Sequence, residues 1–288
     1  MPGYLAETIP SHANAISERG GPIVVGLGLI EAIADQTLLS RADPNDADGD
    51  GISGRANLIT APEFLGLPAG QYNGKYLGRF GRKAGAITLL QQTANAYHQD
   101  MGITSDFIPE ENFNPLAGGR GGDPIPDPEI SAATVNDVVF YLQTLRPPMR
   151  RNENDAQVLR GEQLFNSIKC SSCHVPTMMT GPHPVAALSS RPAYLYSDLL
   201  LHDMGPDLAD NFIEGEATGS EWRTTPLWGL GIVENVLGGT PFYLHDGRTS
   251  DLRVVIELHK GEANASRLAF QQLSTSDQEA LFRFLKSL

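Results

Sequence analysis

The sequence predicts a mainly α-helical protein made of two units, residues 1–147 and 148–288, with many loops. Three observations support this prediction. Apolar residues recur at helical spacing in several segments. A Pro147-Pro148 pair separates two such segments, and stretches rich in Gly and Pro connect others. A chain of 288 residues is long enough for two domains of ordinary size, each with its own core.

In the first unit, the clearest helical pattern has Val135, Val138, Val139, Leu142 and Leu145 on one face. Because proline interrupts a helix, this helix should end just before Pro147.

Two further segments, 87–104 and 225–247, end in similar turns. The first turn is Tyr97–Gly102 and the second is Tyr243–Gly247, and each segment precedes a helix that closes its unit. This parallel indicates a diverged internal repeat.

In the second unit, a helix is expected from Asp155 to about Ile168. Gly161 lies in the middle of its apolar face, where glycine costs about 1 kcal/mol relative to alanine. We therefore expect another backbone to cross closely at Gly161, and the last helix is the expected partner. That helix should begin at a capping box of Ser276 and Glu279.

The two cysteines of the chain lie in the run Cys170-Ser-Ser-Cys173-His174. A Cys-x-x-Cys-His motif is typical of covalent c-type haem attachment. The two sulfurs form thioethers with the haem vinyl groups, and the adjacent histidine becomes the proximal iron ligand. The motif therefore predicts a covalent haem c held by Cys170, Cys173 and His174.

Two other chemistries use a Cys-x-x-Cys pair. A redox-active dithiol usually lies near a βαβ pattern, which the flanking sequence lacks, and it leaves His174 unexplained. A structural zinc site needs about four ligands, and two cysteines with scattered histidines are a poor set. Haem attachment is the interpretation that we favour over both.

A helix that leads into Cys-x-x-Cys-His, crossed by a terminal helix, is the plan of a small cytochrome c. We therefore expect two cytochrome c-like units. The second holds the haem, and loops wrap around it. The first has no Cys-x-x-Cys-His motif, so it is expected to be an incomplete unit.

Charge and hydropathy narrow the partners and the location. The net charge of −13 argues against nucleic acid. An acidic surface could serve to dock a basic redox partner protein, or it could simply keep the protein soluble. No segment approaches the ~20 apolar residues that cross a bilayer. Covalent haem c is attached outside the bacterial inner membrane, so we expect a periplasmic protein.

The first residues, MPGYLAETIP, show no basic region followed by an apolar one, so no signal peptide is visible. We interpret this contrast with the expected export as a sign that Met1 is not the true start.

The sequence resembles the bacterial di-haem oxidoreductase (peroxidase-like) family, which is related to di-haem cytochrome c peroxidases. The resemblance covers nearly the whole chain from about Gly21. It implies a second haem in the first unit, although the family's N-terminal attachment motif is missing here. It also implies that the haem at His174 passes electrons to that second haem, where peroxide is cleaved. Its motifs lie at 26–32, 48–55, 78–85, 199–205, 222–231 and 244–248.

Three functions remain open. The first is electron transfer within a di-haem peroxidase-like oxidoreductase. The second is a mono-haem electron carrier without enzymatic activity, which a single haem motif favours. The third is a thiol-disulfide oxidoreductase, which requires free thiols at Cys170 and Cys173.

The second axial ligand of the iron has several candidates, namely His183, His202, Met204, His245 and His259. In the resembling peroxidases a methionine ligand follows the histidine of a His-Asp-Gly turn by about fourteen residues, and the same count from His245 leads to His259. His259 is therefore our first choice and Met204 the second. The alternative is a surface histidine at a helix C-terminus.

Other residues are candidates for binding the haem periphery. Arg223 and Arg248 match propionate groups because a guanidinium fork fits a carboxylate. His202 and His245 are interpreted as residues that order loops or propionates, and Trp228 as a core residue or part of an electron path. In the first unit, His98, Asp100 and Met101 are expected to face an unfilled cavity.

An acidic loop at 46–57 is a candidate calcium site. Asp46, Asp48 and Asp50 occupy positions 1, 3 and 5, and glycine occupies position 6, as in a calcium loop. Position 12 is Asn57 instead of a bidentate glutamate, which weakens the match to an EF-hand. The alternative is an acidic turn without a metal ion.

Overall fold

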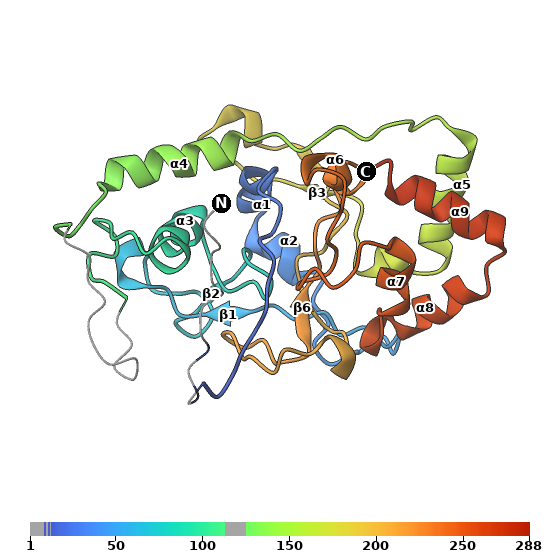
Figure 1. Cartoon of the computed structure of the whole chain (residues 1–288), viewed down its shortest axis with the longest axis horizontal. Helices are drawn as coiled ribbons and strands as arrows, with labels where there is room; N and C mark the ends of the chain where they lie inside the picture. The colour runs from blue at the N-terminus through green and yellow to red at the C-terminus, as the bar shows by residue number, and fades with distance from the viewer. Residues whose placement is uncertain (1–8, 10, 12, 113–124) are drawn as a thin grey trace.

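The computed structural model describes residues 9, 11, 13–112 and 125–288. Short helices and long connections dominate these residues, so the mainly helical prediction is confirmed (Figure 1). The helices are α1 (Leu27–Ala32), α2 (Asp35–Leu39), α3 (Leu89–Asn95), α4 (Ala132–Thr144), α5 (Ala156–Ser167), α6 (Val233–Val236), α7 (Leu252–Glu257), α8 (Asn264–Gln271) and α9 (Thr275–Leu285).

The β-structure consists of three short antiparallel pairs. β1 (Leu58–Ile59) pairs with β2 (Tyr76–Leu77), and β3 (Met178–Met179) pairs with β4 (Pro192–Ala193). The third pair, β5 (Leu201–Asp203) with β6 (Glu221–Arg223), aligns His202 with Trp222. These pairs fix loops rather than form a layer of the fold.

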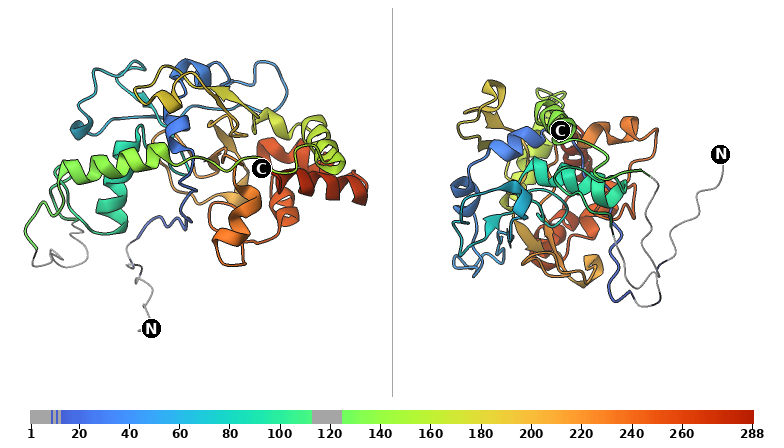
Figure 2. Two further views of the ribbon diagram at one scale, coloured as in Figure 1. Left: turned by 90° about the horizontal axis from the view of Figure 1, so that it is seen from above. Right: turned by 90° about the vertical axis from the view of Figure 1, so that its left-hand side faces the viewer.

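The molecule is elongated, with a different group of helices at each end (Figures 1 and 2). α3 and α4 lie at one end, and α5, α7, α8 and α9 lie at the other. The extended segment between Thr144 and Ala156, which contains Pro147 and Pro148, runs from α4 to α5. Pro147 therefore follows the end of α4, as predicted.

Two hydrophobic cores hold the described residues together. One core combines residues of the first half with a part of the second half that follows the Cys-x-x-Cys-His motif. The boundary at 147/148 remains a prediction, because residues on both sides of it share this core. Its buried members are Ile30, Ile33, Leu38, Leu77, Phe80, Ala86, Leu89, Val175, Met178, Ala193, Leu195, Leu199 and Trp228.

The second core lies between α5, α7, α8 and α9 and reaches the haem-attachment motif. Cys170 packs against it, as do Leu227, Leu230 and Ile256. Burial of aliphatic and aromatic side chains stabilises this end by roughly 25 cal/mol per Å² of apolar surface. Its buried members are Val158, Phe165, Ile168, Tyr196, Leu252, Phe270, Leu281, Phe284, Leu285 and Leu288.

The predicted crossing of α5 and α9 is confirmed at Gly161. A Cβ atom on Gly161 would lie 2.1 Å from the carbonyl oxygen of Ala280 and 2.6 Å from Cβ of Phe284. Only glycine lets the two backbones approach this closely. The crossing fixes the direction in which α5 delivers the chain to Cys170.

The helix starts show one wrong prediction. Asp155 caps α5 by accepting hydrogen bonds from the backbone of Gln157 and Val158. α9 is capped by Ser274, whose hydroxyl accepts from the backbone N–H of Asp277, and not by Ser276. The helix begins two residues earlier than expected because Ser274 has the extended backbone of a cap, whereas Ser276 is already helical.

The predicted internal repeat is not seen in the local structure. Tyr97 and His98 lie on a π-helical turn, Ala96–Asp100, that continues α3. Tyr243, in contrast, lies in a non-helical turn where it pairs with Thr249. The similar residues at these two turns adopt different backbone conformations. Across the described residues, no helix has the length and apolarity needed to cross a membrane.

Candidate functional site

The Cys-x-x-Cys-His motif forms a tight turn directly after α5. Cys170–Ser172 is a single 3₁₀ turn, and the backbone N–H of His174 donates to the carbonyl of Cys170 over 3.0 Å. Lys169 adopts a left-handed conformation (φ 65°) that ends α5 and starts this turn. The turn places Cys170 against the second core, and the ring of His174 lies 6.3 Å from that of Phe165, a member of that core.

Both thiols are held in an environment that disfavours thiolates. Burial raises the pKa of Cys170 to about 12, and the nearby Cys173 raises it further. Burial also raises the pKa of Cys173, against the opposing effect of His202. Reactive dithiols have thiol pKa values below the ordinary one, so this site does not have the electrostatics of a thiol-disulfide oxidoreductase.

His174 is half-buried and oriented by the backbone. Its Nδ1 lies 2.9 Å from the carbonyl oxygen of Tyr196. Because a carbonyl can only accept, Nδ1 carries the proton and Nε2 is left with its lone pair. Burial is the main cause that lowers the pKa of His174 to about 4, and the charge of His259 lowers it too. A neutral imidazole with a free Nε2 is the form that binds iron.

His259 has the same kind of hydrogen bond to a backbone carbonyl. It follows the C-terminus of α7, and its Nδ1 donates to the carbonyl of Val255 over 2.7 Å. Burial lowers its pKa, so it is also neutral. His259 is close enough to act on the charge of His174. Within the described chain, neither Nε2 has a hydrogen-bond partner.

His202 has a different environment. Its Nε2 lies 2.8 Å from Asp198 Oδ2, and its Nδ1 lies 2.8 Å from Glu262 Oε2 and 3.6 Å from Cys173 Sγ. Burial opposes the charged form, but the hydrogen bonds to the two carboxylates dominate and raise its pKa well above 6.5. Because both nitrogens are engaged, His202 is a fixed cation beside Cys173 rather than an iron ligand.

The remaining candidate ligands lie in other surroundings. Met204 is half-buried on the turn after β5, where its backbone N–H donates to Ser220. His183 accepts a hydrogen bond at Nδ1 from its neighbour Val185. His245 stacks on Trp222 at 3.7 Å between ring centroids, and burial lowers its pKa to about 4.

A cavity of about 340 Å³ lies in the first half, between α1, α3 and α4. Its lining is mostly apolar and includes Tyr97, Asp100 and Met101. Asp100 and Met101 were expected to face a cavity, whereas Tyr97 was not predicted there. His98 itself does not line it, because its Nε2 is bonded to the carbonyl of Glu110. The volume falls at the lower end of ligand pockets, about 300–1,000 Å³.

Two buried polar groups of this cavity have no partner among the described residues. They are Nη1 of Arg223 and Oγ1 of Thr93, in side chains with 6% and 4% exposure. Arg223 donates from Nε to the carbonyl of Gly81, and burial lowers its pKa to about 10, so it remains charged at neutral pH. An apolar ligand that carries an anionic group fits this cavity.

The side chains of Arg248 and Trp228 are less available than that of Arg223 for contact with a haem. Arg248 donates from Nε to Asp246 and from Nη1 to the carbonyl of Asp207. A propionate would have to compete with these bonds. Trp228 is buried in the first core, and its Nε1 has no partner in the described part of the chain.

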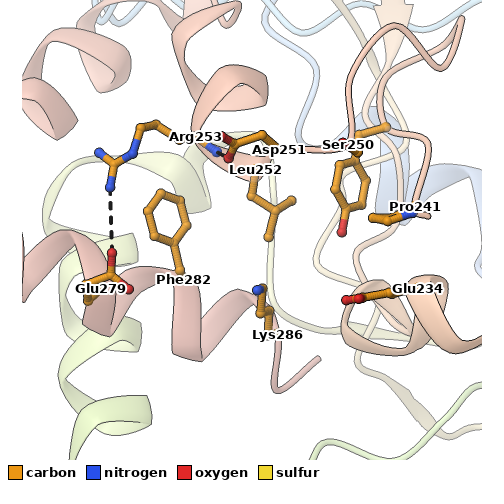
Figure 3. Close-up of a pocket in the computed structure, with 10 residues that line it drawn as sticks. Glu234, Pro241, Ser250, Asp251, Leu252, Arg253, Glu279, Phe282 and Lys286 are labelled. Atoms are coloured by element: carbon orange, nitrogen blue, oxygen red, sulfur yellow. Dashed lines mark hydrogen bonds and ion pairs between the residues drawn. The ribbon is translucent and has the colours of Figure 1, made fainter. Parts of the chain in front are cut away.

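A more open cavity of about 320 Å³ lies beside α7 and α9 (Figure 3). Arg253 and Glu279 form an ion pair of 3.7 Å at its edge, next to the ring of Phe282. Its charges are mixed, and its lining contains none of the histidine, cysteine or arginine candidates predicted from the sequence. We assign it no role in the haem site.

The acidic loop gathers three carboxylates, but one of them differs from the prediction. Ligand oxygens of Asp43, Asp46 and Asp48 lie within 4.8 Å of one another. Asp50 is outside this group, and its Oδ1 accepts from the backbone N–H of Ile52. Asp43 was missed because it precedes the 1-3-5 pattern.

The whole-chain comparison defines the class of protein. The family model "Di-haem oxidoreductase, putative peroxidase" matches residues 11–288, so the chain belongs to this family. It is therefore a haem redox protein. No curated protein matches the sequence.

Two solved structures are similar over nearly the whole chain. One is hydrazine synthase of Kuenenia stuttgartiensis, pressurised with xenon, with 15% identity, a TM-score of 0.39 and 100% of each chain covered. The other is a MauG-like protein associated with microbial copper homeostasis, with 17% identity, a TM-score of 0.37, and 99% and 95% covered. At these TM-scores, neither likeness bears on the function of this chain.

Several residues of the site gave no signal in the sequence. Tyr196 and Val255 act through their carbonyl groups, which every residue type offers. Asp198 and Glu262 are ordinary acidic residues in the sequence, and only folding brings them to His202. Thr93 was hidden within an apolar helical segment.

Proposed function

We propose that this chain carries a covalent haem c and transfers electrons within a di-haem peroxidase-like oxidoreductase. Cys170 and Cys173 form the thioethers, His174 is the proximal iron ligand and His259 is the distal one. The observation that carries the proposal is the pair of half-buried neutral imidazoles, each fixed at Nδ1 by a backbone carbonyl.

The residues around this pair fit a haem. Cys170 packs against the second core together with Leu227, Leu230 and Ile256, so an apolar macrocycle meets apolar side chains there. The ring of Phe165 lies 6.3 Å from that of His174. When bound, the haem supplies one-electron redox chemistry. The chain's residues orient both imidazoles, keep them neutral and exclude water from them.

The cavity in the first half supports a second haem in the complete arrangement. Arg223 would pair with a propionate there, since its Nη1 is buried without a partner. Peroxide reduction takes two electrons and two protons to give two waters. We propose that a redox partner protein, a cytochrome or similar donor, supplies these electrons through the second half.

The alternative is a mono-haem electron carrier without enzymatic activity. It is supported by the single Cys-x-x-Cys-His motif, and the proposed ligand pair of His174 and His259 would leave the iron no open coordination position. The thiol-disulfide alternative is disfavoured by the raised pKa values of Cys170 and Cys173.

Two further proposals concern the cellular location of the protein and a calcium site. Covalent haem attachment places the protein in the periplasm or another extracytoplasmic compartment. The acidic loop is proposed as a calcium site, with Asp46, Asp48 and Asp50 from the sequence pattern and Asp43 from the observed cluster.

The ligand assignment is tested by spectroscopy of the haem-loaded protein. We expect a low-spin spectrum without the near-infrared band of methionine ligation. The substitution His259→Ala should make the iron high-spin and reactive with carbon monoxide, while Met204→Ala should leave the spectrum unchanged. The assignment is wrong if Met204→Ala opens the iron and His259→Ala does not.

A further inference from the structure

The segment that follows His259 is anchored by a single carboxylate. Glu262 comes three residues after His259, at the 3₁₀ turn Gly261–Ala263 that connects α7 to α8. Its side chain is 13% exposed and accepts four hydrogen bonds. A carboxylate has about four acceptor positions, so Glu262 is fully used.

The four donors come from two other parts of the chain. Ser53 donates from its backbone N–H (3.0 Å) and from its hydroxyl (2.6 Å). On β5, His202 donates from Nδ1 (2.8 Å) and Asp203 from its backbone N–H (3.2 Å). Glu262 therefore joins three segments: the end of the acidic loop, β5, and the segment that carries His259. We call this set of contacts the Glu262 clasp.

The charges of the clasp make it strong. Asp198 holds the second nitrogen of His202, which keeps the imidazole cationic toward Glu262. Hydrogen bonds between charged partners are shorter and roughly twice as strong as neutral ones. Exposed ion pairs, in contrast, contribute about 0–1 kcal/mol. The nearby Lys260–Asp207 pair is of this second kind, with side chains 42% and 45% exposed.

The backbone between His259 and Glu262 has no room to move independently. Gly261 has φ of +55°, and a Cβ atom there would lie 2.1 Å from the carbonyl oxygen of Asp203. The segment is therefore pressed against the end of β5 where Glu262 binds. A change at Glu262 is transmitted over three residues to the imidazole of His259.

We propose that Glu262 is a positioning residue for the distal ligand. The clasp holds the segment that presents His259, and Ser53 makes the acidic loop part of that hold. The retention of His259 on the iron thus depends on a contact between the two halves of the chain. This inference rests on the proposed function, because it assumes that His259 binds the haem iron.

The test compares Glu262→Gln with Asp207→Asn in the haem-loaded full chain. Asp207→Asn is the matched control, because it breaks the exposed ion pair that Asp207 makes with Lys260, which lies on the same segment as Glu262. Glutamine keeps the shape of glutamate but loses the charge. We expect Glu262→Gln to keep its covalent haem, to show high-spin iron, and to bind carbon monoxide about tenfold faster than wild type, in line with the loss of a charged hydrogen bond. Asp207→Asn should behave as wild type.

A second, milder variant tests the inference even if Glu262→Gln does not fold. Ser53→Ala removes one hydroxyl donor and leaves the charged pair of Glu262 and His202 in place. It should increase the carbon monoxide rate in the same direction, by about threefold for a net loss of one ordinary hydrogen bond. Equal rates in wild type, Glu262→Gln and Ser53→Ala would overturn the inference.

Failure of the proposed function gives a different result. If His259→Ala leaves the wild-type spectrum unchanged, His259 is not a ligand and both proposals fall. If His259→Ala opens the iron while Glu262→Gln and Ser53→Ala do not, the ligand assignment stands and only the positioning role of Glu262 is refuted.

Discussion

At the scale of single residues, the histidines His174, His202 and His259 differ in what their nitrogens contact. His174 and His259 each donate once, to a carbonyl group, and stay neutral. His202 donates to two carboxylates and is cationic. The same side chain is thus neutral with a free Nε2 in one environment, as a metal ligand requires, and cationic in another.

The sequence identified Cys170, Cys173 and His174 as a site because their spacing is local. It separated His259 from His202 only through the resemblance to known peroxidases, because the contacts that distinguish the two histidines are made with partners far along the chain. Glu262 is 60 residues from His202 and 209 from Ser53. Such contacts are made only in the folded chain and leave no pattern in the sequence.

The clasp predicts a pH dependence of folding stability. His202 and Ser53 hold the pKa of Glu262 at about 2, below its ordinary 4.5, although burial opposes this. A depressed folded-state pKa contributes stability above the ordinary value, and this contribution is lost as pH falls toward 2. At pH 6, Glu262→Gln should destabilise the protein by roughly 2 kcal/mol.

Denaturant unfolding at several pH values checks this prediction. The difference in free energy of unfolding between wild type and Glu262→Gln should shrink as pH falls below about 4.5. Glu257→Gln, an exposed substitution on α7, is the control and should show little difference at any pH. If this difference stays constant from pH 6 to pH 3, the charge of Glu262 does not contribute to folding stability.

At the scale of elements, apolar periodicity predicted the long helices well. α4, α5 and α9 lie where the sequence places them, and the Gly161 crossing was correctly expected. The short strand pairs were not predicted, because two or three residues carry no periodic pattern. The cap of α9 was misplaced because Ser274 and Ser276 are both good capping residues, and only the backbone distinguishes them.

The Gly161 crossing predicts the outcome of a single substitution. Gly161→Ala gains about 1 kcal/mol of helix propensity, but its Cβ would overlap Ala280. Overpacking of this kind costs about 1–3 kcal/mol, and the close approach to a backbone carbonyl puts it at the upper end, so we expect net destabilisation of about 2 kcal/mol. Thermal unfolding measures it. Gly21→Ala, where a Cβ meets no atom within 4 Å, is the control. A stabilised Gly161→Ala variant would contradict the close crossing.

At the scale of the whole molecule, the two ends are joined by buried polar contacts as well as by the first core. The Glu262 clasp connects the acidic loop to the haem-binding end. Lys83 is fully buried, pairs with Asp210 over 2.9 Å and lies 4.3 Å from the ring centroid of Trp222. We therefore expect the two halves to unfold together rather than as separate units.

This arrangement predicts weak peroxidase activity for the chain alone. Peroxide cleavage needs an open iron and a positioned acid-base group, and general acid-base catalysis alone contributes about 10²–10⁴-fold. With the proposed ligands His174 and His259 both bound, the iron would have no open position. Steady-state turnover with a reduced cytochrome donor should be near background, and His259→Ala should increase it. Fast turnover by the unsubstituted chain would refute the closed-iron arrangement.

The most direct test of the account is covalent haem attachment at the motif. The chain is expressed with a periplasmic export signal and the c-type haem maturation system, denatured, and extracted with acidified acetone. We predict that the haem stays with the polypeptide, and that a Cys170→Ala, Cys173→Ala double variant releases it. A wild-type haem that extracts freely would contradict the central claim.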